Sequence, residues 1–377
     1  MTRKSSGKDE KLMSGSTFGN QFKITTWGES HGAAVGVVID GCPAGLALTP
    51  EDIQVFLDRR KPGSSKYATP RKESDLVEIL SGVFEGCTTG TPISLLIRNE
   101  TQQSRDYSEI KSYYRPGHAD YTFDAKYGFR DYRGGGRSSG RETIGRVAAG
   151  AVASKLLSEL SIEISTYTHS IGPITIKDGQ PDLTQMNQNP LCMPDAEAAD
   201  RAASYLDDCM KNGNSSGGTI ECIVKGMPAG VGEPVFDKLD ACLAKAIMSI
   251  GAVKAFEIGS GHEAAVMTGL ENNDAFEMKD NKITKKTNHA GGILGGISDG
   301  DTIVLRCAIK PTPSITSPQQ TVNQNGENIE VSVKGRHDPV IVPRAVVVVE
   351  SMVALTLVDL LFENMHSRLD LFKKFYQ

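Results

Sequence analysis

Two histidines of the sequence stand in glycine-bounded turns where an imidazole could transfer protons. His31 belongs to a G-E-S-H-G segment at 28–32, whose glycines let the backbone approach a ligand and whose Ser30 adds a hydroxyl. His118 follows Pro-Gly in an R-P-G-H-A-D segment, so a turn of restricted geometry holds its ring. An imidazole titrates near neutral pH, which suits general acid–base catalysis. Both are candidate proton-transfer groups, and a solvated turn histidine is the simpler alternative for each.

A basic, glycine-rich stretch at 133–143 is a candidate anion-binding segment. It reads R-G-G-G-R-S-S-G-R-E-T and leads into an expected helix. Glycines expose backbone N–H groups, a helix N-terminus adds partial positive charge, and arginines supply paired donors. Residues 111–146 contain eight Lys/Arg and four Asp/Glu, a local net charge of +4 in a chain whose net charge is −5. This pattern favours a phosphate or carboxylate ligand.

Two later segments also carry groups that could bind or react. The segment 310–314, K-P-T-P-S, combines an amine and hydroxyls on a rigid turn, as in a phosphate clasp. The segment 336–339, R-H-D-P, joins a guanidinium, an imidazole and a carboxylate; an Asx cap before the last helix is its alternative interpretation. The seven histidines form no H-x-x-x-H or H-E-x-x-H pair, so no metal site is expected.

Two other classes of protein share parts of this pattern. The segment 28–32 matches the G-x-S-x-G nucleophile elbow of serine hydrolases, with Ser30 as nucleophile. That elbow needs a preceding strand and a following helix, whereas 33–39 has the composition of a strand. The segment 130–146 could instead be a Gly-Arg module for RNA, with Tyr127, Phe129 and Tyr132 as stacking rings.

The elements that position these residues are expected from hydrophobic periodicity and capping signals. A Thr-Pro-Glu-Asp start at 49–52 predicts a helix, because Thr caps it and Pro suits its first turn. The run Val346–Val349 fits a strand or a helix, and its length with flanking residues favours the helix. Strands are expected at 36–39, 76–83, 93–97, 219–225, 252–258 and 301–309, and further helices at 141–160, 237–249 and 344–362.

The two halves of the chain repeat short motifs in the same order. G-C-P-A-G at 41–45 recurs as G-M-P-A-G at 226–230, and the glycine pattern of 82–90 recurs ungapped at 292–300. This suggests an internal duplication, with halves at about 14–165 and 215–365 in one domain at 14–377, and a site at their junction. Short strands without regular crossover helices favour an α+β fold with antiparallel sheets.

The bulk composition favours a globular protein of a reducing compartment. Hydrophobic residues make up 39% and charged residues 23%, and the negative net charge argues against a nucleic-acid coat. Seven cysteines without a C-x-x-C pair look like scattered thiols. Residues 1–13 resemble a disordered leader without the apolar core of a signal peptide. The apolar stretch 345–362 contains Glu350 and Asp359, which argues against a membrane span. A cytoplasmic location is expected.

Together these segments resemble the chorismate synthase family. The shared motifs are G-E-S-H-G, R-P-G-H-A-D, G-G-G-R-S-S-x-R-E-T, G-G-I-L-G-G-I-S, K-P-T-x-S-I and G-R-H-D-P, in the family's order over roughly residues 18–362. The resemblance implies a β-α-β sandwich with a helical layer between antiparallel sheets, and a homotetramer. It also implies a lyase that converts 5-enolpyruvylshikimate 3-phosphate to chorismate by anti-1,4-elimination of phosphate, using reduced FMN without net redox change. This is the last common step of aromatic amino acid biosynthesis.

The resemblance also implies roles for individual residues. His31 would be the proton donor near the departing phosphate, with Ser30 and Ser139 as catalytic hydroxyls. His118 would lie near the flavin N1/O2 edge, and Asp338 near flavin N5. The positions that match substrate binders are Arg60, Lys66, Arg115, Ser139, Arg141 and Arg336. The positions that match FMN binders are Arg137, Ser138, Ser139, Gly251, Ala252, Gly295, Lys310, Pro311, Thr312, Pro313, Ser314 and Arg336.

Some positions depart from the family pattern. Lys66 stands where arginine is usual, which keeps the charge and loses the paired donors. Gly140 replaces a common alanine, and Gly251 replaces a common asparagine, which removes a side-chain bond to flavin there. Arg60 and Lys66 also match positions proposed to touch a nicotinamide phosphate, so NADPH stays open as an indirect reductant. We expect an external reductant for FMN instead of a bifunctional enzyme. The expectation of a tetramer instead of a dimer rests only on the resemblance.

Overall fold

The computed structural model describes residues 15–63, 65–69, 73–100, 109–133, 135–177, 181–279, 281–333 and 338–377. The expected leader at 1–13 lies outside the described residues, as do Arg336 and His337. All seven cysteines are free thiols.

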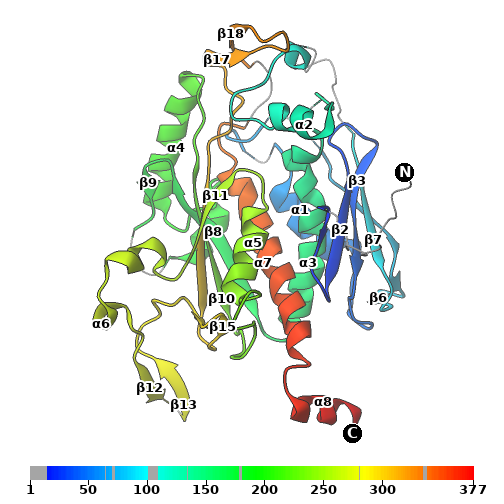
Figure 1. The fold of residues 1–377 in the computed structure, drawn as a ribbon, viewed down its shortest axis with the longest axis vertical. Helices are drawn as coiled ribbons and strands as arrows, with labels where there is room; N and C mark the ends of the chain where they lie inside the picture. Colours follow the sequence, from blue (N-terminus) through cyan, green and yellow to red (C-terminus); the bar gives the residue numbers. More distant parts are fainter. Residues whose placement is uncertain are drawn as a thin grey trace, which may run out of the picture.

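Two five-stranded antiparallel sheets enclose a layer of helices (Figure 1). The first sheet has the order β1 (Thr17–Phe18), β2 (Lys23–Gly28), β3 (Ala34–Asp40), β7 (Ile93–Arg98) and β4 (Val77–Ser81). The second has the order β11 (Val253–Ile258), β16 (Ile303–Ile309), β10 (Gly218–Lys225), β8 (Glu163–Ile171) and β9 (Ile174–Thr175). The helices between them are α1 (Pro50–Arg60), α3 (Thr143–Glu159), α5 (Leu239–Met248) and α7 (Val342–Asn364). The expected α+β sandwich is confirmed.

The helix α1 begins where the capping signals predict. Thr49 is its N-cap, Pro50 is its first residue, and Thr49 and Asp52 form a reciprocal capping box. Its buried side chains, Ile53, Leu57 and Arg60, follow the helical period and face the core. Arg60, the last residue of the helix, therefore lies on its buried face.

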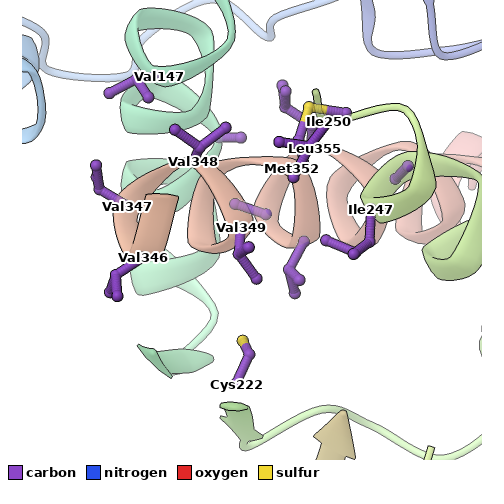
Figure 2. Close-up of a cluster of buried hydrophobic side chains, with 14 of the residues drawn as sticks. Val147, Cys222, Ile247, Ile250, Val346, Val347, Val348, Val349, Met352 and Leu355 are labelled. Carbon is purple, nitrogen blue, oxygen red and sulfur yellow. The ribbon is translucent and has the colours of Figure 1, made fainter. Parts of the chain in front are cut away.

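The helix α7 is apolar on every side because it lies between both sheets and the other helices. The run Val346–Val349 is helical and buried, so the strand alternative is wrong. Figure 2 shows these valines with Val147 of α3, Ile247 at the end of α5 and Cys222 of β10 around them. Length and apolarity alone would let α7 cross a membrane, but 83% of its most apolar window is buried within the protein.

The polar side chains of α7 are paired, as buried polar groups must be. Glu350 receives two hydrogen bonds from the Arg59 guanidinium, at 2.8 and 2.6 Å. Asp359 accepts the backbone N–H groups of residues 20–22 at 2.6–2.9 Å, which attaches the first turn of the described chain to this helix.

The two halves repeat the same arrangement of elements. In each, a strand leads through the Pro-Ala-Gly turn to a central helix, and a short hairpin precedes the next long strand. The Thr88 hydroxyl donates to the Pro43 carbonyl in the first half, and the Ser298 hydroxyl donates to the Pro228 carbonyl in the second. This correspondence agrees with the internal repeat in the sequence.

Other elements lie outside the sandwich (Figure 1). They are α2 (Asp120–Tyr127), α4 (Ala196–Lys211), α6 (Gly269–Asn272) and α8 (Leu369–Tyr376), with the hairpins β5 (Val83–Phe84)–β6 (Cys87–Thr88), β12 (Phe276–Lys279)–β13 (Lys282–Lys285), β14 (Ile293–Leu294)–β15 (Ile297–Ser298) and β17 (Gln319–Val322)–β18 (Asn328–Val331). Short 3-10 turns occupy Glu109–Ser112, Gly136–Ser138, Gly140–Glu142, Leu183–Gln188 and Gly261–Val266. α2 and β17–β18 mark one end of the molecule, and α8 and β12–β13 mark the other.

Candidate active site

The glycine-rich segment before α3 contacts two other motif segments and the end of α1. The Arg137 guanidinium donates to the Gly28 carbonyl at 3.3 Å, which connects it to the G-E-S-H-G turn. A Cβ added at Gly135 would lie 3.1 Å from Cε1 of His118. The Gly140 carbonyl accepts from Arg60 at 3.1 Å. Segments far apart in the sequence therefore meet at residues 135–143.

The G-E-S-H-G turn joins β2 to β3. Ser30 and His31 are both 8% exposed, and the Ser30 Oγ lies 3.3 Å from the His31 Nδ1. The His31 imidazole also contributes to lowering the pKa of Asp131, after a stronger hydrogen bond from Arg133. A strand follows the turn instead of a helix. The nucleophile-elbow interpretation is therefore wrong for Ser30.

The second histidine turn is organised around a buried carboxylate. Asp120, the first residue of α2, accepts from the Arg115 Nε and Nη2, each at 2.8 Å, and its Oδ1 lies 2.9 Å from the His118 Nδ1. Arg130 adds a contact at 3.4 Å. Burial raises the pKa of Asp120, but hydrogen bonds from Arg115 and His118 outweigh it and hold the pKa well below its usual range. Two of the three guanidinium nitrogens of Arg115 are thus used within the protein.

Two of the expected substrate-binding arginines share one carboxylate. Arg60 Nη2 lies 3.3 Å from the Asp75 Oδ2, and Arg141 Nη1 lies 3.0 Å from the Asp75 Oδ1. Arg141 also donates to the Asn99 side chain and lies 3.6 Å from Glu73. Burial lowers the pKa of Arg60, and Asp75 opposes this change. Among the described residues, the buried Nε of Arg60 has no hydrogen-bond partner.

Asp338 lies beside this arginine pair but caps no helix. Its Oδ1 accepts the Thr69 N–H at 2.8 Å, and the Arg344 Nη1 donates to both carboxylate oxygens at 3.0 and 2.9 Å. The N-cap of α7 is Ile341, without a side-chain cap bond. The Asx-cap interpretation is therefore wrong. Arg344 also donates to the Arg60 carbonyl, which joins Asp338 to the end of α1.

The segment 310–314 meets both the His118 turn and the end of α5. The Lys310 ammonium donates to the Gly117 carbonyl at 2.5 Å, and the Lys310 backbone N–H donates to the Ala252 carbonyl at 2.9 Å. Burial lowers the pKa of Lys310, and nearby Lys254 lowers it further. The buried Thr312 hydroxyl has no partner among the described residues. Two ammonium groups and a free hydroxyl here suit an anionic ligand.

Not every expected residue joins this group. The Lys66 ammonium is exposed and pairs with Asp207 of α4 at 3.0 Å. Gly295 lies in the β14–β15 hairpin beside the first residue of α5, whereas Gly251 follows its last turn, about 15 Å further along by helical rise. The hydroxyls of Ser138 and Ser139 bond within their own turn. Arg336 lies outside the described residues.

The basic segment is not an open cationic surface. Arg133 pairs with Asp131, Arg137 and Arg146 with Glu142, and Arg141 with Asp75. Carboxylates neutralise the guanidiniums that an RNA backbone would contact, which argues against the RNA alternative.

Sequence reasoning missed the carboxylates that hold the arginines. Asp75 and Glu73 lie in a polar stretch with no motif, and their partners are distant in sequence. Arg344 and Lys254 likewise carry no local signal. Asp120 was visible in R-P-G-H-A-D, where a carboxylate two residues after a histidine was the available clue.

A hollow of about 190 Å³ lies next to this group. It is lined by Arg59, Tyr67, Cys192 and Arg344 among others, and shares only Arg344 with the contacts above. Neither His31 nor His118 lines it. The candidate site is therefore defined by converging side chains and not by this hollow.

Known proteins that are similar to this chain in sequence or fold share one family name. The chorismate synthase family model matches residues 22–362. A chorismate synthase of Lachnoclostridium phytofermentans is 70% identical over 366 residues, covering 97% of this chain and 100% of that protein. One of Methanocella arvoryzae is 57% identical over 350 residues, covering 92% and 94%. A crystal structure of chorismate synthase has a TM-score of 0.75 and 32% identity, covering 95% of this chain and 96% of that one. The chain belongs to the chorismate synthase family.

Proposed function

We propose that this family member eliminates phosphate from 5-enolpyruvylshikimate 3-phosphate to give chorismate, as a carbon–oxygen lyase that needs reduced FMN. The observation that carries the proposal is the convergence on residues 135–143. Three groups of side chains meet there. They are the Ser30–His31 turn, the His118 imidazole bound to Asp120, and the pair Arg60 and Arg141 bridged by Asp75. The substrate carries a phosphate and two carboxylates, for which paired guanidiniums are the suitable donors.

The arginine pair would bind an anionic group of the substrate. Asp75 fixes the direction of Arg60 and Arg141 before any ligand arrives, and the free Nε of Arg60 offers a further donor. Holding donors in place reduces the reorganisation needed on binding. Arg115 has only its Nη1 left for a ligand, because Asp120 occupies the other two nitrogens.

Two imidazoles would supply the proton chemistry. His31, buried beside the Ser30 hydroxyl, would donate a proton to the departing phosphate oxygen. His118 would exchange a proton at the nitrogen opposite Asp120, toward the cofactor. Both lie on turns and not on apolar stripes, which suits a chemical role better than a role in packing.

The residues at 251–252 and 310–314 fit FMN. The Lys310 and Lys254 ammonium groups and the buried, unpartnered Thr312 hydroxyl could meet its phosphate or its ring oxygens. When bound, reduced FMN would supply electron density to the reacting ring while phosphate and the C6 proton leave, without net redox change. Asp338 would accept a proton at its Oδ2, which accepts from Arg344 but not from the Thr69 N–H.

The remaining expectations are part of the same proposal. An external reductant would supply electrons, with NADPH acting indirectly. The chain would work as a homotetramer in the cytoplasm. Within a single chain, Asp207 of α4 binds the Lys66 ammonium, so we do not expect Lys66 to contact Arg60 or Arg141.

An anaerobic assay tests the proposed reaction. The protein is incubated with the enolpyruvyl ester and chemically reduced FMN, and chorismate is followed by absorbance and chromatography. We expect many product molecules per flavin. Turnover with oxidised FMN alone, or one product per flavin oxidised, would contradict the proposal. No product with reduced FMN would refute it.

A further inference from the structure

The His118 imidazole is bound on one edge by a carboxylate that is almost entirely buried. Asp120 is 4% exposed, and its Oδ1 lies 2.9 Å from the Nδ1 of His118. The same carboxylate accepts two hydrogen bonds from Arg115. Its backbone position at the first residue of α2 places it in the favourable field of the helix N-terminus.

Two neighbours compete for the His118 Nδ1. The Arg115 Nη2 lies 3.0 Å from it and carries two hydrogens, so it could donate one to Asp120 and the other to a bare Nδ1. The Asp120 carboxylate, 2.9 Å from the same nitrogen, instead requires a proton on Nδ1. The pKa of Asp120 is well below its usual range, because Arg115 and His118 outweigh burial, so the carboxylate is ionised at neutral pH and only accepts. An unprotonated Nδ1 would place two lone pairs against each other at 2.9 Å. The contact is favourable only when Nδ1 carries a proton.

The opposite edge of the ring faces the glycine-rich turn. A Cβ added at Gly135 would lie 3.1 Å from the Cε1 and 3.3 Å from the Nε2 of His118, and 3.4 Å from the Ser138 Oγ. The Nε2 thus lies beside the 135–138 turn, and Asp120 lies on the other side of the imidazole. With Nδ1 protonated, a neutral ring has its free lone pair on Nε2.

We propose that Asp120 is the positioning residue of His118, and that it fixes the Nδ1–H tautomer so that Nε2 is the nitrogen that exchanges protons. The tautomer is inferred from the negative charge of Asp120 and its 2.9 Å distance from Nδ1, and its meaning for catalysis rests on the proposed function. Both carboxylate oxygens of Asp120 are engaged by Arg115 and His118. Asp120 acts through the histidine, as carboxylates that orient imidazoles do.

The charged groups that face this imidazole come from four places. Asp120 and Arg115 flank Nδ1, and Arg130 lies 3.4 Å from the same carboxylate. Lys310 approaches the turn from the other segment through the Gly117 carbonyl. Of these, only Asp120 is negative, so its removal changes both the hydrogen-bond acceptor and the local charge.

The experiment measures the tautomer directly, without activity. Long-range ¹H–¹⁵N spectra of [¹⁵N]histidine-labelled protein distinguish protonated from bare ring nitrogens, and His118→Gln identifies the signal. We expect Nδ1–H in the neutral ring of the free protein. In Asp120→Asn, the single amide oxygen stays with Arg115 and the amide N–H₂ faces the ring, so the neutral ring should change to Nε2–H. The pH profile of turnover should shift, with a rate loss of ~100-fold or more.

Two further variants separate positioning from structure. Asp120→Glu keeps the charge and should restore the tautomer in part, with part of the rate. Asp124→Asn removes the other α2 carboxylate near Arg130, at 3.6 Å, and should change neither tautomer nor pH profile.

Each outcome of these experiments either supports or overturns the proposed role of Asp120. An Nε2–H tautomer in the unmodified protein overturns the proposal, even if Asp120→Asn fails to fold. An unchanged tautomer, rate and pH profile in a folded Asp120→Asn protein also overturns it. If Nδ1–H is found but no chorismate forms with reduced FMN, the proposed function fails and the positioning stands.

Discussion

Gly135 combines a left-handed backbone with direct contact to a proposed catalytic ring. Its φ is +90°, and a Cβ there would lie 3.1 Å from the Cε1 and 3.3 Å from the Nε2 of His118. Gly135→Ala therefore adds one methyl group against an imidazole whose other edge is held by Asp120. The ring cannot retreat without lengthening that 2.9 Å contact. The backbone strain should lower the stability of the fold, and the contact with His118 should lower the rate, so the two effects can be measured separately.

The strain can be measured on a matched position. Gly128, the C-cap of α2, has φ +79° and ψ −12°, and a Cβ there would meet nothing within 4 Å. Both Gly→Ala changes should therefore destabilise the fold by about 1–2 kcal/mol, the cost of a left-handed alanine. Only Gly135→Ala should also displace the imidazole. A shift of the ring by even part of an ångström should slow turnover by ~10- to 100-fold.

Thermal unfolding and chorismate formation with reduced FMN, on the same samples, separate the two effects. We expect similar losses of Tm in both variants, and a lower rate only in Gly135→Ala. Equal rates in the two variants, with the His118 ring signals unchanged, would refute the argument that this contact matters. A rate loss that tracks Tm in both would refute it as well.

Four other substitutions test the remaining assignments. His31→Ala and His118→Ala should each lower the rate ~10²- to 10⁴-fold without changing Tm, and a near-normal rate in a folded variant contradicts that residue's role. Asp338→Asn should bind FMN normally, measured by fluorescence quenching, yet turn over ~100-fold more slowly because the amide accepts no proton; an unchanged rate argues that Asp338 is structural. Gly150→Ala should cost about 1–3 kcal/mol, because its Cβ would lie 2.2 Å from that of Ser351 at the α3–α7 contact. Adding Ser351→Gly removes the Cβ and Oγ contacts but leaves the Cα of residue 351 at 2.6 Å from the new Cβ, so Tm should be restored only in part; no loss in the single variant contradicts the packing argument.

Most of the fold followed from local signals in the sequence. The Thr-Pro-Glu-Asp start gave α1 its first residue, and the expected strand 301–309 is β16, in which alternate residues from Ile303 to Ile309 are buried. The strand β8 and the helix α4 had not been expected. The alanine-rich α4 has a helical period but contains no capping or chemical motif that was recognised. The strand β8 has polar side chains such as Thr166 and Thr168 at buried positions. Periodicity fails where tertiary packing buries polar residues.

The site was predictable as a set of motifs but not as a set of contacts. The histidine turns and the glycine-rich segment carry recognisable spacing, so His31, His118 and residues 133–143 could be named. Which side chain pairs with which depends on elements far apart in the chain. Asp75 meets Arg141 across 66 positions of sequence, and Lys66, expected beside the arginines, instead meets Asp207 on α4. No local pattern encodes either contact.

The carboxylates also change what the local charge means. The net charge of +4 at 111–146 suggested free cations awaiting an anion, yet Asp75 comes from outside that segment and bridges two arginines at 3.3 and 3.0 Å. A bridged guanidinium loses part of its attraction for a ligand but gains a fixed direction, and directed donors stabilise a specific anion better than mobile ones. The same reasoning applies to Asp120, which occupies two nitrogens of Arg115 and one of His118. Asp75 and Asp120 are thus buried acids whose contacts fix the direction of the arginine and histidine side chains.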